Sequence, residues 1–206
     1  MNRFILAVFA FLITAAGPAV YADEPPASVE KWTDSRLPVS TELELWLDAT
    51  KVNGTELIPH DGKIAVWFDG SGNQRHMRQS EVDAQPIRLP VGETAIVRFD
   101  GVDDVVRFAG GPAVSREQLT LVAVASPRRN SGGFRALMAL NAEGQRDLDS
   151  GMTVDLGPTL TSRFSALNVE GRGFGTWENL LLSERSMREL SVFEITADAT
   201  TVKLTV

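Results

Sequence analysis

The chain has 206 residues, with 20 basic and 27 acidic side chains, a formal net charge of −7 and no cysteine. This acidic balance argues against nucleic acid or an anionic membrane as the partner, because both recruit basic proteins. Without cysteine, these residues offer no disulfide, no thiolate metal site and no thiol nucleophile.

Residues 1–22 have the three-part pattern of a secretory signal peptide. Arg3 supplies a positive charge, residues 4–16 form an apolar run, and Val20 and Ala22 frame a cleavage site. A membrane anchor is the alternative, but the apolar run is shorter than the ~20 residues that a bilayer span needs. We therefore expect cleavage after Ala22, no membrane insertion of the processed chain, and a secreted or periplasmic protein of net charge −8.

The processed chain is expected to divide into a leader and one domain. Residues 23–38 are polar and include Pro25 and Pro26, which predicts a flexible, extended leader. The remaining residues, 39–206, fit the usual size of one domain, which is ~100–200 residues. They are numerous enough to bury a sizeable core.

Short segments with two-residue alternation recur through residues 39–206, separated by Gly, Pro, Asn and Asp, which is the pattern of β-strands and turns. The run 119–126 is continuously apolar, and its length and composition favour a central strand over a short helix. The expected strands are 43–47, 64–68, 95–99, 105–108, 119–126, 134–140, 152–156, 163–169, 191–196 and 201–206. This pattern predicts an all-β fold, an antiparallel β-sandwich, that ends in a hairpin turning at Asp198 and Ala199.

Three of the apolar runs end in Asp-rich turns, at residues 44–49, 67–73 and 97–104. Together they resemble the opening of a laminin-G-like, concanavalin-A-like jelly-roll domain of the bacterial secreted type, as in planctomycete-like exported proteins. The resemblance covers residues 39–206 and matches the first two-thirds to three-quarters of the family domain. It therefore implies a jelly roll that is incomplete at its C-terminal end, and a chain that is a piece of a longer polypeptide.

The resemblance also implies a function. Domains of this family are commonly non-catalytic recognition modules that bind carbohydrate or a protein partner at the cell surface or in the periplasm. An alternative is a structural domain that packs within a larger exported protein. A glycoside hydrolase is a further alternative, because some glucanases share the fold.

Two acidic turns are candidate calcium sites. Asp69 and Asn73 lie in a tight Gly-containing loop, and carboxylate and amide oxygens on such a turn are ligands that calcium uses. Asp100, Asp103 and Asp104 form the second cluster, where a divalent ion would relieve repulsion between carboxylates. Ordinary turn chemistry is the alternative at both places, since Asp and Asn bond their own backbone. The sequence requires no cofactor for certain, and calcium is the candidate.

A glycine-rich loop carries the candidate ligand-binding residues. Phe174 and Trp177 lie in this loop, where an exposed aromatic ring can stack on a sugar, and Arg172 lies beside them. Packing of these rings onto the sandwich is the alternative.

No catalytic residue is assigned. Retaining glucanases of this fold alternate carboxylates along one strand so that the acid and the nucleophile lie close together. Here Glu42 and Glu44 alternate, but the order of acidic residues around them does not match that pattern. We therefore expect a protein that is not an enzyme.

Overall fold

The computed structural model describes residues 11–14, 33–39, 41–51, 62–108, 110, 116–146, 149–172 and 179–206. Within these residues the regular elements are β-strands and two single-turn 3-10 helices, Ala49–Lys51 and Val82–Ala84. Each strand pair is antiparallel. The predicted all-β class is confirmed. Most of the predicted signal peptide and leader lies outside the described residues.

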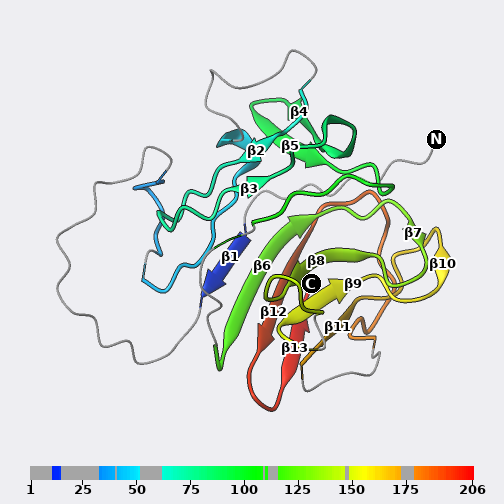
Figure 1. Cartoon of the computed structure of the whole chain (residues 1–206). Helices are drawn as coiled ribbons and strands as arrows, with labels where there is room; N and C mark the ends of the chain where they lie inside the picture. Colours follow the sequence, from blue (N-terminus) through cyan, green and yellow to red (C-terminus); the bar gives the residue numbers. More distant parts are fainter. Residues whose placement is uncertain are drawn as a thin grey trace.

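The largest sheet has the strand order β1-β6-β12-β13. These strands are β1 (Phe11–Thr14), β6 (Leu119–Ala125), β12 (Ser191–Ala197) and β13 (Val202–Thr205). Figure 1 shows β6 between β1 and β12. The predicted hairpin between β12 and β13 is present, and the Oδ1 atom of Asp198 accepts the amides of Thr200 and Thr201, each at 2.8 Å.

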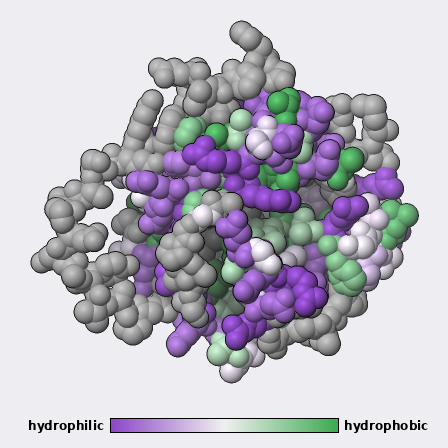
Figure 2. Space-filling view, in the orientation of Figure 1, coloured by the Kyte–Doolittle hydropathy of each residue, from purple (hydrophilic) through white to green (hydrophobic). Residues whose placement is uncertain are grey.

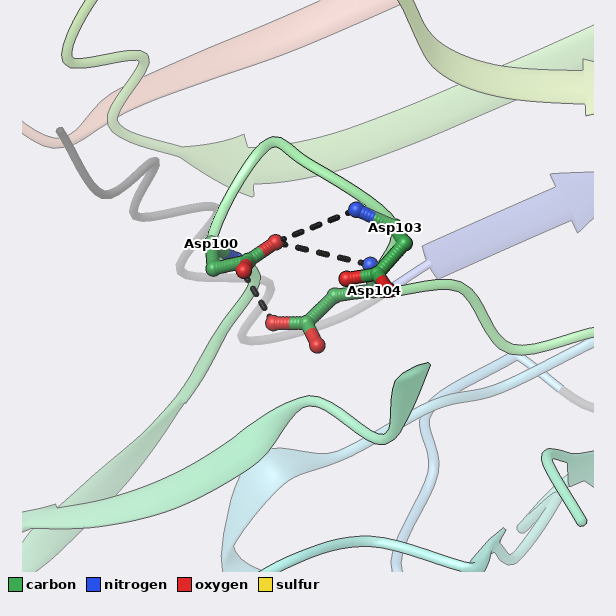
Figure 3. A group of neighbouring side chains, drawn as sticks. All are labelled: Asp100, Asp103 and Asp104. Atoms are coloured by element: carbon green, nitrogen blue, oxygen red, sulfur yellow. Dashed lines mark hydrogen bonds between the residues drawn. The ribbon is translucent and has the colours of Figure 1, made fainter. Parts of the chain in front are cut away.

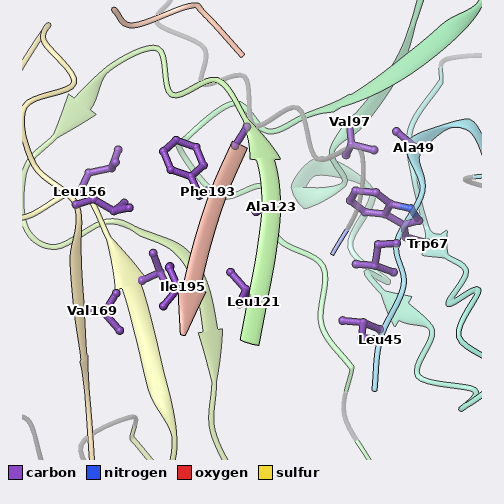
Figure 4. Packing of buried hydrophobic residues seen from close by; sticks show 14 of the residues in the cluster. Leu45, Ala49, Trp67, Val97, Leu121, Ala123, Leu156, Val169, Phe193 and Ile195 are labelled. Atoms are coloured by element: carbon purple, nitrogen blue, oxygen red, sulfur yellow. The ribbon is translucent and has the colours of Figure 1, made fainter. Parts of the chain in front are cut away.

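A second sheet, with the order β11-β9-β8, packs against the first. Its strands are β8 (Ala136–Leu140), β9 (Met152–Asp155) and β11 (Asn168–Gly171). Figure 4 shows Phe193 and Ile195 of β12 pointing toward Leu156 and Val169 across the space between the sheets. All four side chains are buried. Alternation along each strand produces this arrangement, because every second residue faces the core.

Three two-stranded sheets complete the described fold, with orders β2-β3, β4-β5 and β10-β7. Their strands are β2 (Val66–Trp67), β3 (Met77–Arg78), β4 (Ile87–Val91), β5 (Thr94–Arg98), β7 (Asn130–Ser131) and β10 (Leu160–Thr161). The Trp67 side chain is 1% exposed. Its indole Nε1 donates to the carbonyl of Asp48 at 3.1 Å, so this large ring is buried with its polar atom satisfied.

The segment 43–47 differs from its prediction. Leu43, Leu45 and Leu47 are buried in alternation, as expected for a strand, but the segment makes only isolated contacts of the β type. Side chains of the 69–75 loop supply most of its hydrogen bonds, and the Gly70 amide adds one backbone bond to the Trp46 carbonyl at 2.8 Å. The hydrophobic pattern therefore identified the buried face, while polar side chains largely take the place of a ladder of backbone bonds.

Candidate functional site

Asp69 is a buried carboxylate whose oxygens are used by the protein itself. Its Oδ1 atom accepts the amides of Trp46 and Ser71, both at 2.9 Å. Its Oδ2 atom accepts the Ser71 hydroxyl at 2.7 Å and the Arg75 amide at 3.1 Å. A carboxylate has about four acceptor sites. Asp69 is therefore arranged as a structural acceptor that closes its own loop.

Asn73 fastens the same loop to the buried segment 43–47. Its Nδ2 atom donates to the carbonyls of Leu43 at 2.6 Å and Glu44 at 3.2 Å. The structure therefore brings Asp69 and Asn73 into one loop, as the sequence predicted, and it directs the Asn73 amide nitrogen at backbone oxygens. Calcium binding at this loop stays a prediction.

Asp100, Asp103 and Asp104 lie together in a turn after β5, and each offers an oxygen within 4.8 Å of the others. Figure 3 shows how the turn uses these groups. The Oδ1 atom of Asp100 accepts the amides of Val102 at 2.8 Å and Asp103 at 3.3 Å, and Asp104 Oδ2 accepts the Asp100 amide at 2.6 Å. The cluster thus forms a turn stabilised by two of its own carboxylates.

Asp104 has a carboxyl group whose pKa is raised well above its ordinary value. Burial raises the pKa of Asp104 to about 6, and repulsion from Asp100 and Asp103 adds to the rise. The hydrogen bond from the Asp100 amide and the charge of Lys63 act in the opposite direction. A cation would favour the ionised form, but calcium takes six to eight oxygen ligands. The three carboxyl groups form part of such a set, and calcium at this cluster also stays a prediction.

The predicted ligand-binding loop is largely outside the described residues. Phe174 and Trp177 both fall in the range 173–178, which the structure does not describe. Arg172 is described and is exposed, and its amide donates to the carbonyl of Gly151 at 3.0 Å. The prediction that these three residues bind a ligand is therefore untested.

The turn after β7 presents an aromatic ring that the sequence analysis did not select. Gly132, Gly133 and Phe134 all have left-handed backbone conformations, with φ values of 78°, 68° and 53°. Such a conformation is unusual for a bulky residue and indicates a position fixed by its surroundings. The Phe134 amide donates to the carbonyl of Gly157 at 3.2 Å. The side chain of Phe134 is nevertheless 42% exposed.

Leu160 lies in the strand that pairs with β7, and its side chain is 62% exposed. Arg135 follows Phe134, is exposed, and makes no ion pair with any residue in the described part of the chain. We call Phe134, Arg135 and Leu160 the rim. Figure 2 shows hydrophobic side chains at the right edge of the molecule, where β7 and β10 lie in Figure 1.

A buried asparagine supports the rim from below. Asn130 is 1% exposed, and its Nδ2 atom donates to the carbonyl of Leu156 at 2.6 Å. Its Oδ1 atom accepts the amide of Gly132 at 2.8 Å. These bonds fix the backbone that carries Phe134, so the ring is presented from a rigid turn rather than from a flexible loop. In the sequence, the feature that could have indicated this turn is the pair Gly132 and Gly133 directly before the aromatic residue Phe134.

Glu44 is held as an ionised group. Burial acts to raise the pKa of Glu44, but hydrogen bonds from Arg116 and Arg75 outweigh it and lower the pKa below its usual range. A general acid in a glycosidase needs a raised pKa so that it carries its proton at neutral pH. The environment of Glu44 is arranged for the opposite effect.

Comparisons of the chain with protein-family models, curated proteins and solved structures found no match. The part of the chain that the structure describes holds no helix with the length and apolar character needed to cross a membrane.

Proposed function

We propose that the chain is an exported, non-catalytic recognition domain whose rim binds carbohydrate that carries acidic groups. One observation carries this proposal: a rigid turn holds the Phe134 ring exposed beside Arg135, a cation without an ion pair to any described residue. An aromatic ring offers an apolar face to a sugar, and a guanidinium group matches the geometry of a carboxylate.

The acidic composition of the chain bears on whether the Arg135 guanidinium group is paired within the protein. The whole sequence is acidic, and the Glu44, Asp149 and Glu184 carboxylates are each paired with an arginine. Arg135 has no such pairing among the described residues, which is also true of Arg128 and Arg172, and it is distinguished from them by its place next to the exposed Phe134 ring. Its charge is therefore available to an anionic ligand, and Arg is a residue type enriched at binding sites.

The experiment compares retention of the exported protein on immobilised polygalacturonate and on immobilised dextran. We expect stronger retention on the acidic polymer, and a loss on the order of tenfold for Phe134→Ala, as for an aromatic residue at the centre of a binding site. Arg135→Ala should reduce retention on polygalacturonate by a similar factor and remove the preference over dextran.

Phe108→Ala is the matched control, because Phe108 is 41% exposed, almost the same as Phe134, and lies outside the rim. It should leave retention unchanged. Equal retention on the two polymers, or equal effects of Phe134→Ala and Phe108→Ala, would contradict the proposal.

A protein partner is the second candidate ligand, and the exposure of Leu160 favours it. A single exposed aliphatic side chain is common on protein surfaces, but next to an exposed aromatic ring it adds apolar area of the kind that protein interfaces bury, and it has less use in binding a sugar. A photo-crosslinking residue at position 160 in the exporting cell should then form one protein adduct that Phe134→Ala removes. The same residue at position 182, where Leu182 is also exposed, should not form that adduct.

A further inference from the structure

The two long sides of β6 have different neighbours. On one side β12 pairs with all seven residues of the strand, from Leu119 to Ala125. On the other side, β1 is the one strand of the described residues that pairs with β6, and it covers the four positions from Thr120 to Ala123. In the strand order of this sheet β1 is the outermost strand, so among the described strands it is the one that pairs with this edge of β6.

The covering strand comes from the segment that we expect to be removed. Residues 11–14 fall within the apolar run of the predicted signal peptide, 1–22. Cleavage after Ala22 would take β1 away and leave β6 as an edge strand. Alternate residues of such an edge carry backbone N–H and C=O groups without partners, and these groups pair readily with another strand.

The composition of β6 makes this edge prone to pairing with another strand. The strand consists of Leu, Thr, Val and Ala alone, with no charge, no Pro and no Gly. The opposite edge of the sheet is different, because β13 carries the exposed Lys203 in its middle. A lysine on an edge strand is a common protection against pairing with another chain. β6 itself carries no such residue, so its edge is open to pairing with another strand once β1 is removed.

The backbone register of β1 shows how another strand can use this edge: β1 runs antiparallel to β6, with residue 11 opposite Ala123. A second β6 strand takes the same antiparallel direction when it pairs around Val122. Leu121 then lies opposite Ala123 of the second copy, and Leu119 lies opposite Ala125. Val122 lies opposite itself, on the outer face of the sheet.

We propose that, once residues 1–22 are removed, the β6 edge pairs antiparallel with β6 of a second copy around a two-fold axis at Val122. The strands β13, β12 and β6 of the two copies would then form one continuous six-stranded sheet. The interface is isologous, so pairing stops at two copies. One strand pair buries less surface than standard interfaces of about 1,200–2,000 Å², which predicts a dimer that dissociates in the micromolar range.

The first experiment is analytical ultracentrifugation of the exported protein, at concentrations on either side of that range. Intact mass must show that the chain starts at Asp23. We expect a monomer–dimer equilibrium for the processed chain and a monomer for the full chain that retains residues 1–22. Export without removal of residues 1–22 would overturn the proposal, because β1 would stay in place.

Val122→Glu tests the position of the two-fold axis. It places two glutamates opposite each other, and each also lies opposite Glu194 on β12 of its own chain, so the like charges destabilise the strand pair across the axis. The matched control is Val192→Glu, because Val192 is also on the outer face of this sheet and is 55% exposed, but it lies on β12 rather than at the edge. We expect Val122→Glu to abolish the dimer and Val192→Glu to retain it.

Mixing Val122→Lys with Val122→Glu tests the register itself. Val122→Glu alone should be a monomer, and the mixture should form a heterodimer, because Lys and Glu then face each other across the axis. A processed wild-type chain that stays monomeric, one that forms large aggregates, or a dimer that survives Val122→Glu would each overturn the proposal. The rim variants should not alter the dimer, so this result is independent of the proposed function.

Discussion

Replacing Asp69 by alanine tests the reasoning about the polar loop most sharply. The substitution removes the acceptor for the amides of Trp46 and Arg75 and for both donors of Ser71. Ser71 is half-exposed and can bond to water. The other two amides lie in a partly buried environment. At about 1.5–3 kcal/mol for each hydrogen bond to a charged group, their loss lowers the free energy of unfolding by about 3–6 kcal/mol.

Asp69→Asn provides a graded control. An amide has one oxygen, so one of the two backbone amides keeps an acceptor and the other faces an NH₂ group. We expect this variant to lose about half as much stability as Asp69→Ala, which is about 1.5–3 kcal/mol. The free energy of unfolding should therefore decrease in the order wild type, Asp69→Asn, Asp69→Ala.

The assay is guanidinium unfolding at neutral pH, followed by the fluorescence of the tryptophans near this loop, Trp46 and Trp67. The cost of Asp69→Ala should be the same in EDTA and in calcium if the carboxylate acts through the backbone amides. A cost below about 1 kcal/mol would refute the structural role, since that is the range of an ordinary surface change. A cost that appears only with calcium would assign Asp69 to a cation site, because a ligand bound to the native state alone stabilises it.

Three further predictions concern a charge, a backbone contact and the core. The raised pKa of Asp104, about 6 against 3.8 for an ordinary Asp, means that the folded chain holds this proton more tightly. The bound proton therefore stabilises the folded state, and this contribution to the free energy of unfolding is complete below pH ~4 and is lost as the pH rises through ~6. Asp104→Asn should therefore raise the free energy of unfolding at pH 7 by about 1 kcal/mol, after allowance for solvent screening, and should not raise it at pH 4. Equal changes in the free energy of unfolding at the two pH values, measured by urea titration, would contradict this. Gly151→Ala would place a Cβ atom 1.7 Å from the Leu140 carbonyl oxygen, so we expect Tm to fall by several °C. Gly144→Ala is the control, because no heavy atom lies within 4 Å of the added Cβ atom, and its Tm should fall far less. Similar melting curves for the two variants would argue against the β8–β9 contact. Phe193→Ala should cost about 3–5 kcal/mol in denaturant, because its buried ring contacts Phe164 edge-on at a centroid distance of 5.5 Å, and a cost near 1 kcal/mol would place it outside the core.

The two-residue alternation predicted the central part of the fold. The apolar run at 119–126 became β6, and the segments 191–196 and 201–206 became the hairpin of β12 and β13. These strands are defined by which side chains face the core, and that information is present in the sequence pattern. The strand β4 was not among the predicted strands, and it contains Pro90, a residue that usually argues against a strand interior.

Other segments depend on partners that the pattern does not show. The segment 105–108 was predicted as a strand but contributes only a single bridge, between Arg78 and Arg107. The segment 163–169 has the regular ladder of β11 only from Asn168 onward, because the Leu167 amide donates instead to the side chain of Asn179 at 3.1 Å. Long-range polar contacts of this kind decide where a ladder begins, and they are invisible to local periodicity.

The candidate site was predicted in part. The grouping of Asp100 with Asp103 and Asp104 follows from their separation in sequence, so the cluster could be identified before the structure. The direction of each carboxylate could not, because it depends on which backbone amides the turn exposes. Phe134 was missed because its exposure results from a left-handed backbone fixed by the buried Asn130, and neither property follows from hydrophobicity.

Isothermal titration calorimetry of the chain with oligogalacturonate, with Phe134→Ala and Phe108→Ala measured in parallel, tests recognition of carbohydrate through the rim. We expect saturable binding that Phe134→Ala weakens on the order of tenfold and Phe108→Ala leaves unchanged. Binding of equal strength in the two variants, or no binding by the wild type, would contradict recognition of acidic carbohydrate through the rim.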